Sequence, residues 1–176
     1  ETTMPNGDET FEKFYNSIFN TNVIIGNIDN AIGDVLDEAI VRQTRDHIKG
    51  EAYALRAFRY FYLVNMYAAP YEPATCEKEP GIPINLEMTA EDKAYHRSSL
   101  KVVYEQIVDD LEKAIPLLEN NPMDTDKTRF SALAAKALLA KVYLYMQTLH
   151  IDTMGQLLKV LFPLKMLFSF PIIALK

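Results

Sequence analysis

The stretch EAYALRAFRYFYL, residues 51–63, recurs later in the chain as AAKALLAKVYLYM, residues 134–146. Six of the thirteen positions are identical when the two stretches are aligned with an offset of 83 residues. The identical pairs are Ala52/Ala135, Ala54/Ala137, Leu55/Leu138, Ala57/Ala140, Tyr60/Tyr143 and Tyr62/Tyr145. Repeated helices built from small and aromatic residues are typical of proteins whose helices stack closely. Such proteins usually bind other molecules rather than catalyse reactions.

The spacing of apolar residues predicts four helices, at residues 10–32, 36–67, 100–118 and 131–149. Each predicted helix has residues near its start that can accept hydrogen bonds from its first backbone N–H groups. These candidate caps are Asp8 or Thr10, the acidic group Asp34, Asp37 and Glu38, Ser98 or Ser99, and Thr128 or Ser131. No stretch alternates strongly enough to predict a sheet. We therefore expect an all-α fold of helical hairpins stacked as a solenoid.

Gly50 lies inside the second predicted helix, where a glycine costs about 1 kcal/mol relative to alanine. Its presence there predicts that a neighbouring helix approaches closely. The tyrosines and phenylalanines that follow it recur at helical spacing, and such a stripe belongs to a protein core more often than to a ligand site. We expect these rings to be buried between helices.

A long irregular connection is predicted at residues 68–97, because it contains four prolines and a glycine. Loops of this length are rare in compact domains unless they serve a function. Cys76 lies in this connection and is the only cysteine, which excludes an intramolecular disulfide or a thiolate metal cluster. We expect its thiol to have no chemical role.

The charge of the chain argues against nucleic acid as a partner, and the pattern of its last 20 residues argues against a membrane-spanning helix. The net charge is −6, from 18 basic and 24 acidic residues, which is unsuited to a nucleic-acid surface. The apolar stretch at residues 157–176 contains Pro163, Pro171, Lys159 and Lys165. We therefore do not expect it to span a membrane as a helix.

No pattern in the sequence predicts catalysis, a cofactor or a metal site. The three histidines are scattered, and HExxH, CxxC, GxSxG and a glycine-rich phosphate loop are absent from the sequence. The acidic group before the second helix is expected to cap it rather than to bind calcium. Asp124 and Asp126 lack the later glycine and glutamate of a calcium loop. Asp109 and Asp110, with Glu112 and Lys113, are expected to form a solvated helix face.

Ordered blocks of residues between positions 11 and 147 also match a known family pattern. The first two blocks are Phe14-Tyr15-x-x-Ile18-x-x-x-Asn22-x-Ile24-Ile25 and Gly50-Glu51-Ala52-x-x-Leu55-Arg56-Ala57-Phe58-x-Tyr60-Phe61-x-Leu63, the second being followed by Tyr67, Pro70 and Gly81-Ile82-Pro83. The third block is Arg97-Ser98 with Val103-Tyr104-x-x-Ile107-x-x-Asp110-Leu111-x-x-Ala114. The fourth block is Arg129-Phe130-Ser131-x-x-Ala134-Ala135-x-Ala137-Leu138-Leu139-Ala140-x-Val142-Tyr143-Leu144-Tyr145. Together they resemble the SusD/RagB family, nutrient-binding lipoproteins of the outer membrane of Bacteroidetes. Each block alone is weakly specific, whereas their order is quite specific.

The resemblance implies a fold of tetratricopeptide-like helix pairs at residues 1–149, in which helix 36–67 pairs with helix 100–118. It implies capture of a glycan or another nutrient at the cell surface, without enzymatic activity. Delivery would go to a SusC-like TonB-dependent transporter, and the protein would be a surface-exposed lipoprotein whose lipidation segment is not in this chain. Family members are longer, and residues 150–176 form an atypical apolar tail. We expect a truncated form with an altered reading frame at that tail.

Candidate ligand contacts within the long connection are Tyr71, Tyr95 and His96, because sugars stack their apolar faces on aromatic rings beside polar groups. The alternative is that these tyrosines pack inward and anchor the loop. An alternative function is a tetratricopeptide-like protein-interaction module without glycan binding, and a further one is a folded remnant that binds nothing. Apolar faces left exposed by truncation would favour self-association.

Overall fold

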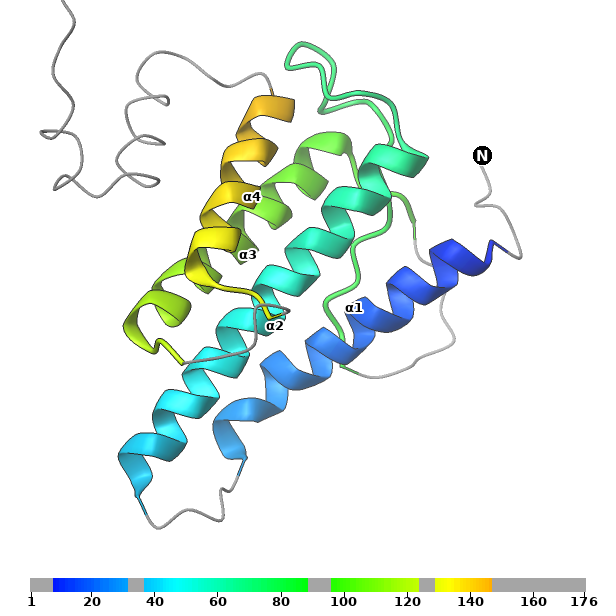
Figure 1. The fold of residues 1–176 in the computed structure, drawn as a ribbon. Coiled ribbons are helices and arrows are strands. Elements are labelled where there is room, and N and C mark those ends of the chain that lie inside the picture. Colours follow the sequence, from blue (N-terminus) through cyan, green and yellow to red (C-terminus); the bar gives the residue numbers. More distant parts are fainter. Residues whose placement is uncertain (1–7, 32–36, 89–95, 124–128, 147–176) are drawn as a thin grey trace, which may run out of the picture.

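A computed structural model of the protein describes residues 8–31, 37–88, 96–123 and 129–146. These residues form α1 (Glu9–Asn27), α2 (Glu38–Tyr67), α3 (Leu100–Asn120) and α4 (Ala132–Tyr145), with a short 3-10 helix, η1 (Ile28–Asn30), after α1 (Figure 1). No strand forms within the described residues, so the predicted all-α fold is confirmed. The structures and placement of residues 147–149 and of the tail 150–176 lie outside the described residues, and the domain division there stays a prediction.

The start of each helix is fixed by a side chain that accepts hydrogen bonds from backbone N–H groups. Asp8 Oδ1 accepts from Thr10 N at 2.9 Å, and Asp37 Oδ1 accepts from Ala39 N at 2.8 Å. Ser99 and Ser131 cap α3 and α4 in the same way. Of the alternatives open in the sequence, the structure therefore selects these four residues as caps. The expected capping role of the acidic group is confirmed for Asp37.

The helices form one layered bundle in which α2 separates α1 from α3 and α4 (Figure 1). Helix α3 packs along α2, and α4 packs mainly against α3. Helices α2 and α3 approach closely at Gly50: a Cβ atom built on Gly50 would lie 2.9 Å from Leu118 Cγ and 3.2 Å from the carbonyl oxygen of Ala114. The close approach predicted from this glycine is confirmed.

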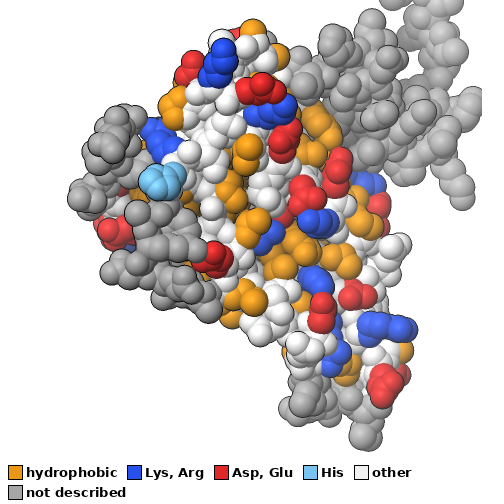
Figure 2. All heavy atoms as spheres, turned by 180° about the vertical axis from the view of Figure 1, so that it is seen from behind, with side chains coloured by type: hydrophobic (Ala, Val, Ile, Leu, Met, Phe, Trp, Pro, Cys, Tyr) orange, Lys and Arg blue, Asp and Glu red, His pale blue; other side chains and the backbone are white. Residues whose placement is uncertain are grey.

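The apolar core is centred on α2 and α3, as the helical spacing predicts. Its fully buried side chains include Ala54, Ala57, Tyr60, Leu63, Val64, Val103, Ile107, Leu111 and Ala114. From the loop, Ile82 is also fully buried, and Cys76 is 4% exposed, in agreement with a thiol that serves as packing. On the face shown in Figure 2, acidic and basic side chains are interspersed with apolar ones. Within the described residues, no helix is long and apolar enough to cross a membrane.

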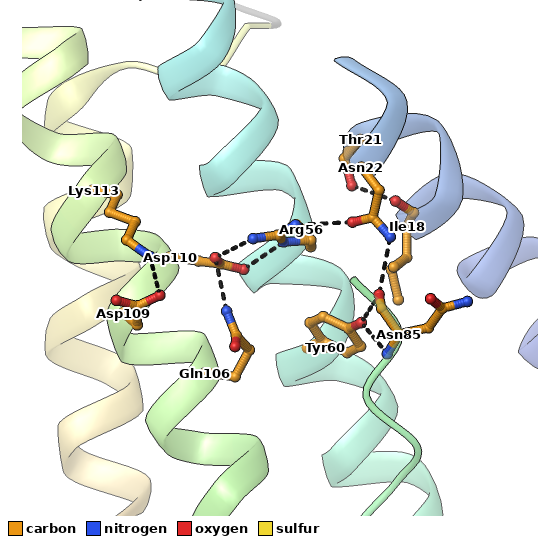
Figure 3. Close-up of polar contacts among 10 residues, drawn as sticks. All are labelled: Ile18, Thr21, Asn22, Arg56, Tyr60, Asn85, Gln106, Asp109, Asp110 and Lys113. Carbon is orange, nitrogen blue, oxygen red and sulfur yellow. Dashed lines mark hydrogen bonds and ion pairs between the residues drawn. The ribbon is translucent and has the colours of Figure 1, made fainter. Parts of the chain in front are cut away.

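A buried polar network centred on Arg56 joins three helices within this core (Figure 3). Arg56 is 5% exposed, and its Nε and Nη2 atoms donate to the carboxylate of Asp110 at 2.8 and 2.6 Å. Its Nη1 atom donates to Asn22 Oδ1 of α1 at 2.9 Å, and Gln106 Nε2 donates to Asp110 Oδ1 at 3.0 Å. The network therefore satisfies a charge pair that would be costly to bury alone.

The expectation that Asp110 lies on a solvated helix face is wrong, because Asp110 is 0% exposed. Its position three residues after Ile107 and four before Ala114 places it on the apolar face of α3. The neighbouring Asp109 behaves as expected and forms an exposed ion pair with Lys113 at 2.6 Å. The sequence pattern of adjacent charges did not distinguish the two carboxylates.

The long connection between α2 and α3 is irregular, as predicted, but side chains fasten its backbone to the helices. Tyr15 Oη of α1 donates to the carbonyl of Pro83 at 2.7 Å, and Tyr60 Oη of α2 donates to that of Asn85 at 2.6 Å. Asn22 Nδ2 also donates to the Asn85 carbonyl, at 3.0 Å. Where the loop returns to α3, Arg97 Nε donates to the carbonyl of Gly81 at 2.6 Å. The described part of the loop is therefore held in one position relative to the bundle.

Candidate functional site

An open pocket of about 340 Å³ lies where the C-terminal ends of α2 and α4 meet the start of the long loop. Its lining residues are Asn65, Ala68, Ala69, Pro70, Tyr71 and Tyr145. The helix α2 ends at Tyr67, and Pro70 follows three residues later, where it cannot continue the helix. Beyond this stop, Tyr71 lines the pocket together with Tyr145 of α4.

The two tyrosines of the pocket are held in different ways. Tyr71 is 8% exposed, and its ring packs edge-on against Tyr104 of α3, with centroids 4.8 Å apart. Burial raises the pKa of the Tyr71 phenol above its usual value. Tyr145 is 43% exposed, and its ring rests edge-on against Phe61 at 5.1 Å. One ring thus forms a fixed wall, and the other offers an accessible face.

Asn65 supplies the polar side chain of the pocket. Its Nδ2 atom donates to the carbonyl of Phe61 one turn earlier in α2, at 2.6 Å, which fixes the orientation of the amide. The residue is exposed, so its amide can also be reached from solvent. Two aromatic rings and one oriented amide are the combination that recognises a ring-shaped ligand with an apolar face and hydroxyl groups.

An aromatic surface continues from the pocket along α2 and α4. Tyr62 is 40% exposed and flanks the buried Phe61, and the two ring centroids are 6.2 Å apart. Lys141 of α4 extends over these rings, with its Nζ atom 5.5 Å from the Phe61 centroid and 5.8 Å from that of Tyr145. Tyr145 therefore belongs both to the pocket and to this surface.

The residues predicted from the sequence as ligand contacts fall in different places. Tyr71 lines the pocket, although most of its side chain is buried as the loop-anchoring alternative expects. Tyr95 lies outside the described residues. His96 is exposed just before α3 and is not among the pocket-lining residues. A role in ligand binding stays a prediction for all three.

Sequence reasoning did not select Tyr145 or Asn65 as site residues. A signal for Tyr145 was present, because it is the repeat partner of Tyr62 and both lie near the end of their helices. Its exposure could not be read from the repeat, since the same pattern places Tyr60, the partner of Tyr143, fully inside the core. For Asn65 the sequence held no signal beyond its proximity to the prolines.

Clustered metal-ligating side chains are not found in the part of the chain that the structure describes. No group of three or more His, Cys, Asp or Glu side chains in that part is arranged to hold a metal ion. The buried His47 donates from Nδ1 to the carbonyl oxygen of Asn121 at 2.9 Å, and so joins α2 to the end of α3. Its surroundings are those of a structural histidine.

A family model described as starch-binding and associating with the outer membrane, SusD-like, matches residues 3–144. Among curated proteins, "SusD-like protein P25" of Formosa agariphila is 26% identical over 142 residues, which are 79% of this chain and 23% of that protein.

Solved structures give the same result. A crystal structure of a putative sugar-binding protein from Bacteroides vulgatus superposes with a TM-score of 0.71 at 27% identity, covering 86% of this chain and 33% of that one. A protein described as a laminarin-binding SusD-like protein superposes with a TM-score of 0.64 at 30% identity, covering 86% and 29%. The chain thus spans 23–33% of the length of these relatives. With four-fifths of its residues matched by the family model and its helices superposing on those of solved members, the chain belongs to the SusD-like family.

Proposed function

We propose that this protein binds a glycan in the pocket between the ends of α2 and α4. The pocket carries this proposal, because it combines the exposed ring of Tyr145, the wall formed by Tyr71 and the amide of Asn65. Carbohydrates are bound through such combinations of stacking and directed hydrogen bonds. Membership of a family of carbohydrate-binding proteins supports binding rather than catalysis as the activity of the site.

The proposal extends to the setting in which binding takes place. The matching family model describes association with the outer membrane, and one solved relative is described as laminarin-binding. We propose that the protein acts at the outer membrane as a surface lipoprotein and passes its ligand to a SusC-like TonB-dependent transporter. Co-purification of the epitope-tagged protein with such a transporter from the native outer membrane tests this step; recovery of the protein without any transporter would reject it.

Isothermal titration of the 176-residue chain against a panel of oligosaccharides tests glycan binding directly. We expect Tyr145→Ala to weaken binding by about tenfold, which corresponds to about 1.4 kcal/mol. Tyr143→Ala is the matched control, because Tyr143 lies two residues away on the same helix and contacts Glu112 of α3 at 3.3 Å instead of lining the pocket. Equal affinity of Tyr145→Ala and the unmodified protein for every ligand bound would exclude the pocket as the site.

The same titrations extend to the loop residues predicted from the sequence. His96 does not line the described pocket and Tyr95 lies outside the described residues, so an effect of His96→Ala or Tyr95→Ala on binding would add the second half of the loop to the site. Tyr71→Ala removes a buried ring and can therefore disturb folding. The helix content of this variant is compared with that of the unmodified protein by circular dichroism. Unchanged binding in all three variants would remove the loop residues from the site.

A second function, a protein-interaction module, is favoured by the exposed apolar side chains of α4. Leu133 is 64% exposed and Leu144 is 58% exposed. Such residues on a folded surface are suited to contact with another protein or with a second copy of the chain. Light scattering, which measures the molar mass in solution, distinguishes self-association from contact with another protein. A second copy bound through α4 would be lost in Leu144→Glu.

A further inference from the structure

Lys141 is an exposed lysine of α4 whose ammonium group is held over three aromatic rings. Its Nζ atom lies 5.5 Å from the ring centroid of Phe61 and 5.8 Å from the centroids of Tyr62 and Tyr145. An ammonium within about 6 Å of a ring centroid is attracted to the negative face of the ring. Because three rings restrict its position, the charge loses less freedom on meeting a ligand than an ordinary surface lysine does.

Most other lysines in the described part of the chain are already paired with a carboxylate. These pairs are Lys13–Glu9, Lys49–Asp29, Lys101–Glu77, Lys113–Asp109 and Lys136–Glu119. No ion pair joins Lys141 to a carboxylate of the described residues within 4.0 Å. Its positive charge is therefore not neutralised by those residues and is available to an anionic group from outside.

Lys141 is connected to the pocket through Tyr145. Tyr145, which lines the pocket, lies one helical turn after Lys141 on the same face of α4. On α2, Asn65 of the pocket lies one turn after Tyr62, whose ring is also under the ammonium. A sugar ring stacked on Tyr145 thus has the Asn65 amide and the Lys141 ammonium on the same continuous surface.

We propose that the glycan bound by this site is acidic and that Lys141 binds its carboxylate or sulfate group. This inference rests on the proposed function, because it names the class of glycan that the same pocket takes. A neutral saccharide would use Tyr145 and Asn65 alone, whereas an acidic unit adds a charge-assisted contact. Lys141 therefore sets the preference for the anion, and the rings supply the stacking that is common to both.

An acidic residue near Tyr71 sets the orientation of the ligand. Glu105 is an exposed residue of α3 whose charge acts on the Tyr71 phenol. This charge disfavours an anion beside Tyr71, so the acidic group of the ligand lies beside Tyr145 and Lys141. The net charge of −6 opposes approach of an anion only weakly at physiological salt, where charges more than about 8 Å apart are screened.

Titration of the 176-residue chain with pairs of saccharides that differ only in charge tests the proposal. The pairs are oligogalacturonate and its methyl ester, oligoalginate and its methyl ester, and carrageenan oligosaccharides before and after desulfation. The first two pairs report on a carboxylate and the third on a sulfate. The protein variants are Lys141→Gln, which removes the charge, and Lys141→Arg, which retains it.

Lys113→Gln is the matched control variant. Lys113 also extends over a tyrosine ring, with Nζ 5.9 Å from the Tyr53 centroid, and its loss changes the net charge equally. It differs in being paired with Asp109 and in not lining the pocket. It therefore separates a local contact at Lys141 from a general effect of protein charge.

We expect the unmodified protein to bind one acidic saccharide about two- to fivefold more tightly than its neutral form, the range of an exposed charge pair. Lys141→Gln should abolish this preference without weakening binding of the neutral form, while Lys141→Arg and Lys113→Gln should retain it. A preference for the neutral form, or one that persists in Lys141→Gln or disappears in Lys113→Gln, overturns the inference and leaves glycan binding standing. Failure to bind any saccharide in a wider panel rejects the proposed function and the inference together.

Discussion

Replacing Asp110 by alanine tests the energetic importance of the buried network that joins α1, α2 and α3. The substitution removes the carboxylate that accepts two hydrogen bonds from Arg56, at 2.8 and 2.6 Å. Arg56 is 5% exposed and cannot reach water without opening the bundle, so its guanidinium would keep only the bond to Asn22. Because an uncompensated buried charge is costly, we expect the free energy of unfolding to fall by about 3–5 kcal/mol.

That loss is a large fraction of the stability of a small domain, which is about 5–15 kcal/mol. Urea denaturation followed by circular dichroism at 222 nm measures it. Asp109→Ala is the control: it removes the adjacent carboxylate, whose pair with Lys113 is about half exposed on both sides. An exposed pair of this kind contributes about 0–1 kcal/mol, so the control should stay close to the unmodified protein.

The double variant Arg56→Met with Asp110→Leu separates the cost of an unpaired charge from the contribution of the pair itself. Replacing both partners by apolar side chains is often nearly neutral. We therefore expect the double variant to be more stable than Asp110→Ala alone. Equal stability of Asp110→Ala and Asp109→Ala, or a double variant less stable than Asp110→Ala, would refute the reasoning.

Three further predictions concern the helix contact, the loop and the first cap. Gly50→Ala gains about 1 kcal/mol of helix propensity, but it places a Cβ atom 2.9 Å from Leu118 Cγ, and overpacking costs about 1–3 kcal/mol. We therefore expect thermal denaturation to show a decrease of up to about 2 kcal/mol in the free energy of unfolding. A higher melting temperature for the variant would contradict this expectation. Tyr15→Phe removes the hydrogen bond to the Pro83 carbonyl and should cost about 0.5–1.5 kcal/mol, with faster amide exchange confined to the loop; uniform exchange rates throughout the protein would oppose this assignment. The Tyr67 hydroxyl donates to Asp8 at 2.5 Å and, with the backbone N–H groups, lowers the pKa of the Asp8 carboxyl. The ionised carboxyl therefore stabilises the folded protein at pH values above its unfolded-state pKa near 3.9. This stabilisation is lost as the pH falls through the lower pKa of the folded state. Urea midpoints between pH 2 and 5 should therefore fall less steeply for Asp8→Asn than for the unmodified protein, and parallel curves would refute this.

The positions of the helices could be predicted from the sequence because they depend on local features. Apolar spacing placed α2 within two residues of its observed start, and the serine caps placed the starts of α3 and α4. The first helix was predicted too long, since α1 ends at Asn27 and the 3-10 helix η1 follows it. Gly50 indicated a helix contact because a glycine at that position has no local reason to be there.

The candidate site could be predicted only in part. Prolines marked the loop that forms one side of the pocket, and Tyr71 within it does line the pocket. Tyr145 belongs to a helix 74 residues further along the chain than Tyr71, and neither its exposure nor its approach to Phe61 follows from local spacing. Asp110 was misjudged for a different reason: its spacing from Ile107 and Ala114 places it on the apolar face of α3, but its partner Arg56 is on another helix and does not follow from local sequence.

By itself the sequence determined an all-α chain, the four helices with a short set of candidate caps for each, and a resemblance to the SusD-like family through an ordered set of residues. Only the tertiary structure decided which tyrosines are buried and which are exposed, which carboxylate is paired inside the core, and that Lys141 lies over three rings beside a pocket. The physical reason is the range of the interactions. Helix formation depends on residues three or four positions apart, whereas burial and charge pairing depend on which faces of distant helices meet.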